Sequence, residues 1–259
     1  MSAPPAEAPP GGSRHTWVVL PAYNEAASLP TLFEAIDVAM REAGLAYNIV
    51  LVDDGSTDRT PEIAERYARR LPLVVERHPV NLGLGATLRD GLTRASELAA
   101  AADVIVTLDA DNSQPAALIP RLVRAVGEGR DVVIASRYRP GSRVHSVPLA
   151  RRALSYWGSW LFRLVLPIPG VRDYTCGFRA YRAEVLKRAL AEQGPAFFDQ
   201  EGFQSMVDVL LKLRRRGLTF GEVPLVLRYD LKQGASKMRV LKTARSTLAL
   251  IVKRRLGSR

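Results

Sequence analysis

Two carboxylates, Asp109 and Asp111, stand two residues apart at the end of an apolar, β-branched run that begins at Val104. Such a run is typical of a buried strand. If strand geometry continues to Asp111, both side chains project from one face. Paired hard oxygen ligands at a strand end suit Mg²⁺ or Mn²⁺, which usually completes its coordination with water and substrate phosphates. The alternative is a strand that runs into an Asp-rich turn, which residues 111–113 also permit.

Polar residues follow several other apolar runs in the same way. These groups are Pro21-Ala22-Tyr23-Asn24-Glu25 after a strand expected over 17–20, Asp53-Asp54 after 48–52, and Ser136-Arg137 after 132–135. In open parallel sheets, ligands bind outside the carboxyl ends of the strands. The repeated placement therefore favours one shared site over a series of separate polar turns.

The patterns of strands and helices alternate along the chain. Further strands are expected over 73–75 and from Val104, and helices over about 29–43, from near Pro61, and after the glycines of Asn81-Leu82-Gly83-Leu84-Gly85. Asp58 or Ser56 is expected to cap the helix that begins near Pro61. The alternation predicts an α/β domain with a mainly parallel central sheet and helices on both faces.

The composition limits the class of protein. The 259 residues are 47% apolar, which allows a sizeable core, and their formal net charge of +11 predicts an anionic partner: a phosphorylated substrate, a membrane surface or nucleic acid. The single cysteine, Cys176, excludes an intrachain disulfide and fits a reducing compartment. No apolar stretch is long enough to span a bilayer, and the N-terminus lacks the apolar core of a signal peptide. We therefore expect a cytoplasmic protein without a transmembrane span that can bind a membrane peripherally.

Two segments combine basic with apolar residues. In 139–172 a basic flank precedes an aromatic, apolar stretch, and in 239–259 leucine and isoleucine alternate with lysine and arginine. The simpler interpretation is a core helix with a solvated basic flank. Because the pattern occurs twice, we favour amphipathic helices at a membrane interface. Residues 1–13, which are rich in Pro, Ala, Gly and Ser, are expected to be a disordered tail.

Seven motifs occur in a definite order between about residues 16 and 245. They are Pro21-Ala22-Tyr23-Asn24-Glu25, Val52-Asp53-Asp54-Gly55-Ser56-Thr57-Asp58, Asn81-Leu82-Gly83-Leu84-Gly85, Asp109-Ala110-Asp111, Ala135-Ser136-Arg137-Tyr138, Asp173-Tyr174-Thr175-Cys176-Gly177-Phe178-Arg179 and Gly234-Ala235-Ser236-Lys237. The ordered set resembles the inverting family-2 glycosyltransferases with the GT-A fold, and within them the dolichol-phosphate mannose synthases and their bacterial polyprenyl-phosphate relatives. The resemblance implies a GT-A catalytic domain over 14–238, which includes 139–172 as the acceptor and membrane-interface segment, and a C-terminal amphipathic basic helix over 239–259.

The resemblance also implies a role for each matching position. Pro21, Tyr23, Glu25 and Asp53 would line the base and ribose pocket; Asp109 and Asp111 would bind Mg²⁺ or Mn²⁺ and the donor diphosphate; Arg137, Arg151 and Ser155 would contact a lipid phosphate; and Lys232, Ser236 and Lys237 would close over the nucleotide. The third ligand on the metal side is Ser113 or Gln114, because this chain departs from the family after the second Asp. Asp109, Asp111 and Arg137 would be the catalytic residues.

These roles predict transfer of a hexose, with mannose from GDP-mannose favoured, to a polyprenyl or dolichyl phosphate. The metal ion would stabilise the departing nucleoside diphosphate as a Lewis acid. A phosphate monoester is already anionic at neutral pH, so this acceptor needs no general base. Arginine forks match the geometry of phosphate, which suits such an acceptor.

Two alternatives stay open. The first keeps the fold but uses a UDP-sugar such as UDP-glucose, or a hydroxyl acceptor on a glycan or lipid with Glu201 or Asp199 as the base. The second is a non-catalytic nucleic-acid-binding module, which is disfavoured because no such motif occurs and the acidic pairs would repel phosphates. The three histidines, His15, His78 and His145, show no ligand spacing and are expected to be structural or surface residues.

Overall fold

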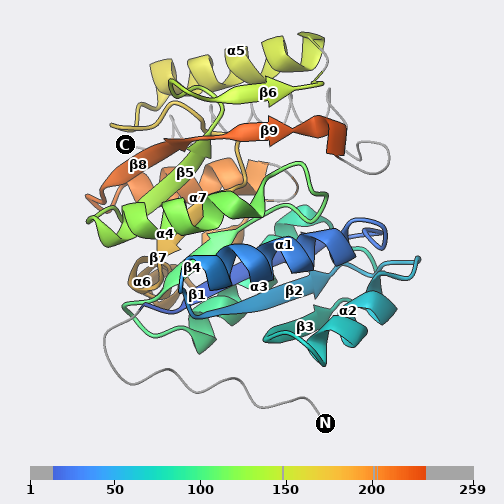
Figure 1. Ribbon diagram of the computed structural model, residues 1–259. Helices are drawn as coiled ribbons and strands as arrows, with labels where there is room; N and C mark the ends of the chain where they lie inside the picture. Colours follow the sequence, from blue (N-terminus) through green and yellow to red (C-terminus); the bar gives the residue numbers. More distant parts are fainter. Residues whose placement is uncertain (1–13, 148, 201, 203, 232–259) are drawn as a thin grey trace.

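A computed structural model of the chain describes residues 14–147, 149–200, 202 and 204–231, without the side chains of 149–154 and 195. Seven strands of this part form one sheet in the order β3-β2-β1-β4-β7-β5-β8 (Figure 1). They are β1 (Thr16–Ala22), β2 (Tyr47–Asp53), β3 (Leu73–Arg77), β4 (Val104–Thr107), β5 (Val132–Ser136), β7 (Arg179–Arg182) and β8 (Phe220–Pro224). A separate parallel pair, β6 (Arg143–His145) and β9 (Val226–Arg228), lies near helix α5 (Leu149–Val165) at one end of the molecule (Figure 1).

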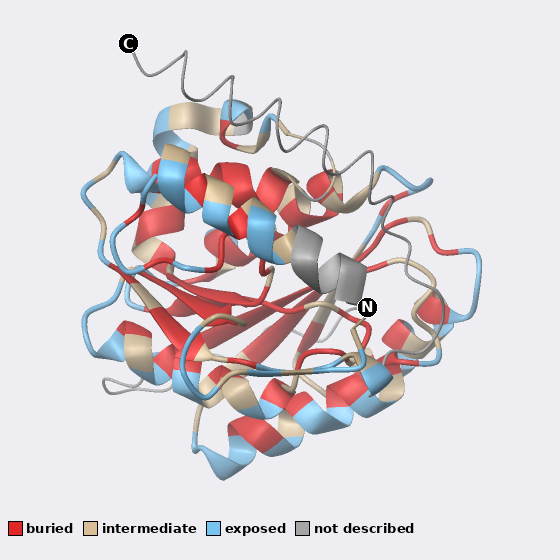
Figure 2. Ribbon diagram, turned by 90° about the horizontal axis from the view of Figure 1, so that it is seen from above, coloured by how far each residue is buried: buried red, intermediate tan, exposed pale blue. Residues whose placement is uncertain are grey.

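Helices cover both faces of the large sheet (Figure 2). On one face α1 (Leu29–Glu42) contacts α2 (Thr60–Ala68) and α4 (Ile119–Gly127), and on the other α3 (Leu84–Leu98) contacts α6 (Ala183–Gln193) and α7 (Gln204–Arg214). Three short 3₁₀ turns, Ala116–Leu118, Gly194–Phe198 and Tyr229–Leu231, complete the described elements. The predicted α/β class, with a mainly parallel sheet between two helical layers, is confirmed.

The core follows from the apolar content of the central strands. Val18, Val19 and Leu20 of β1 and residues 49–52 of β2 are fully buried, as expected for parallel strands covered on both faces. The helices bury one stripe each: in α1 the residues Leu29, Leu32, Phe33, Ile36 and Met40 recur at helical spacing and are fully or almost fully buried.

Parallel pairing brings the carboxyl ends of four strands to one edge of the sheet. Ala22 of β1 pairs with Asp53 of β2, and Val19 of β1 pairs with Thr107 of β4. Strand β5 runs parallel to β4 because both are antiparallel to β7, which lies between them. The polar groups that follow β1, β2, β4 and β5 therefore lie at the same edge, as the sequence predicted.

The antiparallel strand β7 was not predicted. Its first residue, Arg179, pairs with Thr107, the last residue of β4. Because β7 runs in the opposite direction, the residues that precede it reach the edge where the residues after β4 begin. Residues 173–178 thus become part of the same edge, although they belong to a distant part of the chain.

The structure decides two local predictions, one about the end of β4 and one about the start of α2. Strand geometry does not continue to Asp111: β4 ends at Thr107, and Asn112 has a φ of +60°, in the left-handed region that Asn tolerates in turns. Of the two residues expected to cap α2, Asp58 supports its first turn, since its Oδ1 accepts a hydrogen bond from Thr60 N at 2.9 Å. The Ser56 hydroxyl instead accepts one from the backbone N of Asn24 at 2.8 Å.

Some predictions fall outside the described residues. They are the tail over 1–13, the basic helix over 239–259, and the nucleotide-closing residues Lys232, Ser236 and Lys237. Within the described ranges, no helix combines the length and apolar character that crossing a bilayer requires.

Candidate active site

The segment after β4 turns sharply and is held by its own side chains. Ser113 donates from its backbone N and its Oγ to Asp111 Oδ1, at 3.0 and 2.6 Å. Gln114 donates from Nε2 to Asp109 Oδ2 at 2.6 Å, and its Oε1 accepts a hydrogen bond from Asp109 N at 3.0 Å. Each of the two candidates for the third metal ligand therefore orients one carboxylate. Asp111, Ser113 and Gln114 are buried, whereas Asp109 is half-buried.

The donor atoms of this turn suit a hard divalent cation. All are carboxylate, hydroxyl or amide oxygens, the ligand type that Mg²⁺ and Mn²⁺ prefer. Gly177 keeps the space beside Asp109 open, because a Cβ at that position would lie 3.4 Å from Asp109 Oδ1. Among the described residues, no group of three or more His, Cys, Asp or Glu could hold a metal ion. Here the two carboxylates would hold such a cation, with Ser113 or Gln114 as a further oxygen ligand.

Asn24 joins the loops that follow β1 and β2. With a φ of +52°, it directs Oδ1 to accept hydrogen bonds from the backbone N of Thr57 and Asp58, at 2.8 and 3.3 Å. This role was not predicted, since it depends on a loop more than 30 residues away. The joined loops place the half-buried Tyr23 and Glu25 at the edge where Asp53 ends β2.

Asp53 is fully buried, and one of its oxygens lacks a hydrogen bond within the described part of the chain. Oδ1 accepts a hydrogen bond from Ser56 N at 3.0 Å, while Oδ2 lies 3.3 Å from Nε of Arg77, a side chain that is 56% exposed. Buried polar atoms in native proteins are nearly always satisfied. The Arg77 guanidinium thus faces Oδ2, and its charge and the Ser56 hydrogen bond hold the Asp53 carboxylate at this edge.

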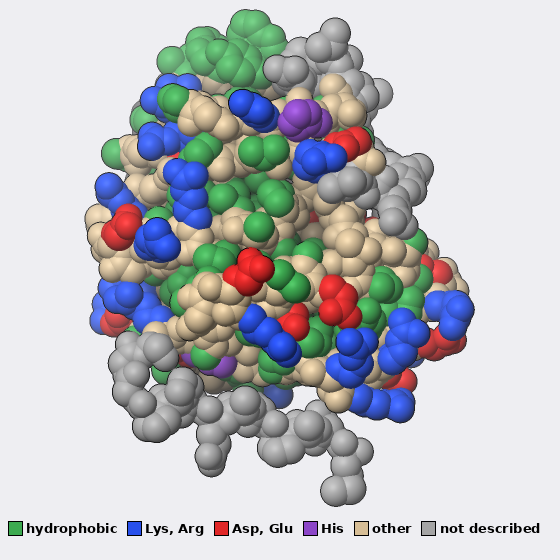
Figure 3. Space-filling model, viewed as in Figure 1, with side chains coloured by type: hydrophobic (Ala, Val, Ile, Leu, Met, Phe, Trp, Pro, Cys, Tyr) green, Lys and Arg blue, Asp and Glu red, His purple; other side chains and the backbone are tan. Residues whose placement is uncertain are grey.

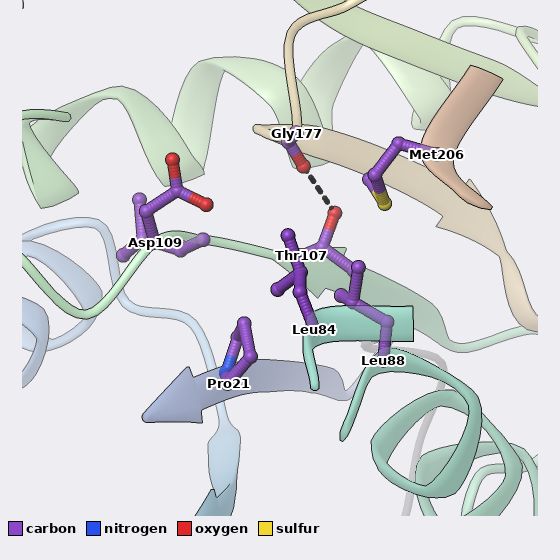
Figure 4. Close-up of a pocket in the computed structure, with 8 residues that line it drawn as sticks. Pro21, Leu84, Leu88, Thr107, Asp109, Gly177 and Met206 are labelled. Atoms are coloured by element: carbon purple, nitrogen blue, oxygen red, sulfur yellow. Dashed lines mark hydrogen bonds between the residues drawn. The ribbon is translucent and has the colours of Figure 1, made fainter. Parts of the chain in front are cut away.

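An apolar pocket lies beside Asp109 (Figure 4). Its lining residues are Pro21, Leu84, Leu88, Thr107, Leu108, Asp109, Gly177 and Met206. Thr107 Oγ1 donates to the carbonyl of Gly177 at 2.6 Å and so ties β4 to the segment that precedes β7. Two predicted site residues, Pro21 and Asp109, are thus brought to one pocket together with side chains of α3 and α7.

Arg137 is held by an acidic residue 36 positions later in the chain. Its Nε and Nη2 donate to Asp173 Oδ2 and Oδ1 at 2.8 and 2.7 Å, and Nη2 also donates to Thr175 Oγ1 at 2.6 Å. Burial opposes both charges, but the attraction between them prevails, so the pKa of Arg137 is raised and the pKa of the fully buried Asp173 is lowered. Within the described residues, Nη1 makes none of these bonds.

Asp199, the candidate base for a hydroxyl acceptor, is paired with Lys212. The Lys212 Nζ atom lies 2.6 Å from Asp199 Oδ1 and 2.9 Å from Asp208 Oδ2. Burial opposes the ionised form of Asp199, but the hydrogen bond and the positive charge of Lys212 prevail and lower its pKa. A carboxylate held in its ionised form in this way is a weak proton acceptor. The other candidate base, Glu201, lies outside the described residues.

Helix α5 presents a row of apolar side chains to the surface, which we call the aromatic face. It consists of Tyr156, Trp157, Trp160 and Leu164, which are 54%, 61%, 44% and 65% exposed. The rings of Trp157 and Trp160 meet edge to face at 5.7 Å between centroids. Figure 3 shows hydrophobic side chains gathered at the end of the molecule where α5 lies. Exposed apolar patches of this kind mark interaction surfaces.

Tyr138 connects the aromatic face to Arg137. Its hydroxyl donates to Ser155 Oγ at 3.0 Å, and its ring meets the ring of Tyr156 edge to face at 5.8 Å. On the other side, the Arg137 guanidinium lies 5.5 Å from the centroid of the Tyr138 ring. Burial raises the pKa of Tyr138, which keeps its hydroxyl protonated. Two predicted acceptor contacts, Arg137 and Ser155, are thus joined by a residue without a predicted role; the side chain of the third, Arg151, is not described.

Comparison with known proteins identifies relatives. Residues 17–190 match the family model described as glycosyl transferase family 2. The dolichol-phosphate mannosyltransferase of Pyrococcus furiosus is 37% identical over 196 residues, which are 75% of this chain and 52% of that protein. The polyprenol monophosphomannose synthase of Mycolicibacterium smegmatis is 33% identical over 228 residues, 87% of this chain and 82% of that protein. An undecaprenyl-phosphate 4-deoxy-4-formamido-L-arabinose transferase of Pseudomonas aeruginosa is 37% identical over 185 residues, 67% and 49% of the two chains.

The chain thus spans about half the length of the Pyrococcus and Pseudomonas relatives and most of the length of the Mycolicibacterium one. Among solved structures, glucosyl-3-phosphoglycerate synthase from Mycobacterium tuberculosis, in complex with Mn²⁺, uridine diphosphate and phosphoglyceric acid, aligns with a TM-score of 0.68 and 22% identity over 93% of this chain and 78% of that chain. Mannosyl-3-phosphoglycerate synthase from Rubrobacter xylanophilus aligns with a TM-score of 0.60 and 18% identity over 94% and 74%. These likenesses show a GT-A-like fold. Since the family model covers more than half of its residues, the chain belongs to glycosyl transferase family 2.

Proposed function

We propose that this protein is a metal-dependent inverting glycosyltransferase that moves a hexose, mannose from GDP-mannose, onto a polyprenyl or dolichyl phosphate. The observation that carries the proposal is the placement of Asp109 and Asp111 at the same sheet edge as Arg137, which Tyr138 joins to the aromatic face of α5. This arrangement combines a cation site for a diphosphate, an arginine for a phosphate acceptor and an apolar surface for a lipid tail. The relatives named as mannose-transferring enzymes of dolichol and polyprenol phosphates support it.

The donor occupies the edge formed by β1, β2 and β4 in this proposal. Pro21, Tyr23, Glu25 and Asp53 line the base and ribose pocket, and Lys232, Ser236 and Lys237 close over the nucleotide. Asp109 and Asp111, oriented by Ser113 and Gln114, hold Mg²⁺ or Mn²⁺. The bound ion supplies a Lewis acid for the charge that develops on the leaving diphosphate. A structural neighbour crystallised with Mn²⁺ and uridine diphosphate supports this use of the fold.

The acceptor phosphate lies between Arg137 and the beginning of α5. The Nη1 donor of Arg137, with Arg151 and Ser155, receives the phosphate through charge-assisted hydrogen bonds, which are stronger than neutral ones. Asp173 keeps the guanidinium in place and charged. Because the phosphate is itself the nucleophile, the engagement of Asp199 with Lys212 does not impair the reaction.

The alternatives use the same site. A UDP-sugar such as UDP-glucose fits the cation site equally well, since the diphosphate is common to both donors. A hydroxyl acceptor requires a base, and the lowered pKa of Asp199 disfavours that residue. Binding of nucleic acid is disfavoured by the carboxylates at the ligand edge.

The proposed reaction is tested with purified protein and Mn²⁺, with GDP-mannose or UDP-glucose as donor. The acceptor is a short polyprenyl phosphate or, in a parallel assay, the matching polyprenol, which ends in a hydroxyl. Mass spectrometry is expected to detect a polyprenyl phosphate hexose from GDP-mannose, and chelation of the metal is expected to abolish it. If only the assay with UDP-glucose gives product, the donor is a UDP-sugar and not GDP-mannose. Transfer to a hydroxyl lipid but not to the phosphate would contradict the acceptor, and no transfer from either donor would contradict both.

We further propose that the aromatic face of α5 binds the cytoplasmic face of the membrane peripherally, supported by the basic segment over 239–259. The double variant Trp157→Ser/Trp160→Ser is expected to bind anionic vesicles at least about tenfold more weakly, because two exposed apolar side chains leave the interface. Sedimentation with vesicles measures this, and rising salt should weaken binding of the unchanged protein. Val38→Ser, at a 50% exposed position of α1, is the matched control. Equal vesicle binding by all three proteins would contradict the proposal.

A further inference from the structure

His78 lies between two carboxylates, directly after β3. It is only 8% exposed, and its Nδ1 and Nε2 atoms lie 2.7 Å from Asp54 Oδ1 and 3.0 Å from Asp90 Oδ2. The ring thus lies within hydrogen-bond distance of a carboxylate on each side. The sequence provided no reason to connect these three residues, which lie at the end of β2, after β3 and on α3.

Asp54 uses both of its oxygens to hold the loop that begins α3. Oδ1 accepts a hydrogen bond from Leu82 N at 2.8 Å, and Oδ2 accepts one from Gly83 N at 2.9 Å. The next residue, Leu84, is the first of α3 and lines the pocket beside Asp109. The position of this pocket wall therefore depends on the orientation of the Asp54 carboxylate, to which His78 donates.

The two loops around Asp54 are packed without spare room. Gly55 has a φ of +67°, and a Cβ there would lie 2.5 Å from the carbonyl carbon of Val80 and 2.7 Å from Asn81 N. His78 also donates its backbone N to the carbonyl of Asp53 at 2.9 Å. One residue thus binds the backbone of Asp53 and the side chain of Asp54, and it holds the loop over 53–56 against the loop over 80–83.

Asp90 fixes the outer side of the imidazole ring. It is paired with Arg89, whose Nε lies 2.6 Å from Asp90 Oδ1. Burial opposes its ionisation, but hydrogen bonds from Arg89 and His78 prevail and lower the pKa of Asp90. The ionised Asp90 carboxylate on α3 therefore orients the imidazole ring from the Nε2 side, while Nδ1 faces Asp54.

We propose that His78 is a positioning residue of the donor nucleotide subsite. Its Nδ1–H orients the Asp54 carboxylate, and Asp54 in turn holds the backbone of Leu82 and Gly83. These contacts keep the Asp53 loop and the first turn of α3 in the arrangement that a nucleoside diphosphate requires. The inference rests on the proposed function, because it assigns this edge to the donor. According to this inference, donor binding depends on the Nδ1 atom of His78 and its contact with Asp54, and not on the presence of an imidazole ring as such.

Two substitutions of His78 separate its nitrogens. The amide nitrogen of Asn can take the place of Nδ1, whereas that of the longer Gln reaches the place of Nε2. His78→Gln is expected to raise the Kd of GDP and of UDP, each measured calorimetrically with Mn²⁺, about tenfold, and His78→Asn less than about twofold. The KM of polyprenyl phosphate is expected to stay within about twofold in both variants, because the acceptor contacts lie across the site.

His15→Gln is the matched control. His15 is also buried, at 7% exposure, with Nε2 2.7 Å from Asn48 Oδ1, but it precedes β1 at the opposite end of the sheet. This variant is expected to leave the nucleotide Kd unchanged, because position 15 lies at the end of the sheet opposite to the donor edge. An equal rise in Kd for His78→Asn and His78→Gln, or no rise in either, overturns the inference.

A variant that leaves His78 in place guards against misfolding. Asp90→Asn keeps the Nδ1 contact with Asp54 and is expected to change the same nucleotide Kd less than about twofold; a rise as large as that of His78→Gln overturns the inference. Failure of the unsubstituted protein to bind GDP or UDP with Mn²⁺ would instead overturn the proposed function itself. Nucleotide binding by the unsubstituted protein therefore distinguishes failure of the His78 inference from failure of the proposed function.

Discussion

Asp109→Asn and Asp111→Asn are each expected to lower kcat/KM for glycosyl transfer at least about a hundredfold, the size of loss typical when an electrostatic group at a transition state is removed. The midpoint of thermal unfolding should stay within about 3 °C of the parent value. Asn keeps an acceptor oxygen for Ser113 at position 111 and for Gln114 at position 109, so the turn after β4 is preserved while a negative charge is lost. Steady-state kinetics and calorimetry measure the two effects.

Asp103→Asn provides the matched control for these variants. Asp103 lies directly before β4, at the opposite end of the strand, and is buried like Asp111. Its carboxylate accepts hydrogen bonds from His15 N, Trp17 Nε1 and Ala100 N, at 3.1, 3.2 and 2.8 Å. Its substitution should reduce stability with little effect on kcat/KM. Near-full turnover in a folded Asp109→Asn or Asp111→Asn protein would contradict the metal assignment.

Arg137→Met is expected to reduce the free energy of unfolding by about 3–5 kcal/mol, because it leaves the fully buried Asp173 carboxylate without its partner. The double variant Arg137→Met/Asp173→Asn should recover roughly half of this loss, since it removes the buried charge as well. Urea unfolding of the three proteins measures both quantities. The double variant should still transfer poorly to polyprenyl phosphate, because the arginine proposed to contact the acceptor is absent. Equal stability of Arg137→Met and the parent would contradict the importance of the pair.

The same pair predicts a dependence of stability on pH. The pKa of Asp173 is lower in the folded protein than in the unfolded chain, so the unfolded chain takes up a proton first as the pH falls. The contribution of the pair is therefore fully present above about pH 4, the ordinary carboxyl value, and is lost as the pH falls through the lowered value. In Asp173→Asn proteins this acid-dependent loss should be smaller, which urea unfolding at several pH values can measure.

The sequence by itself determined the strands and helices up to β5 and the sheet edge at which their polar residues lie. Apolar runs such as those of β1 and β2, and the helical spacing of α1, depend on residues close together in the chain, so periodicity was enough to find them. Because strands that alternate with helices pair in parallel, the residues after β1, β2, β4 and β5 had to share one edge. Prediction of Asp53, Asp109 and Arg137 as neighbours at this edge followed from that rule alone.

Tertiary structure decided the partners of these residues. The sequence could not show that β7 enters between β4 and β5 in the opposite direction, because strand order depends on packing between distant segments. Through β7, Asp173 becomes the partner of Arg137; by similar long-range packing, Tyr138 meets α5 and His78 meets Asp54. Hydrogen bonds between side chains have no periodicity, and their energy depends on burial that only the folded chain creates. The residue types at the candidate site could therefore be predicted from the sequence, whereas the contacts that orient these side chains depend on the tertiary structure.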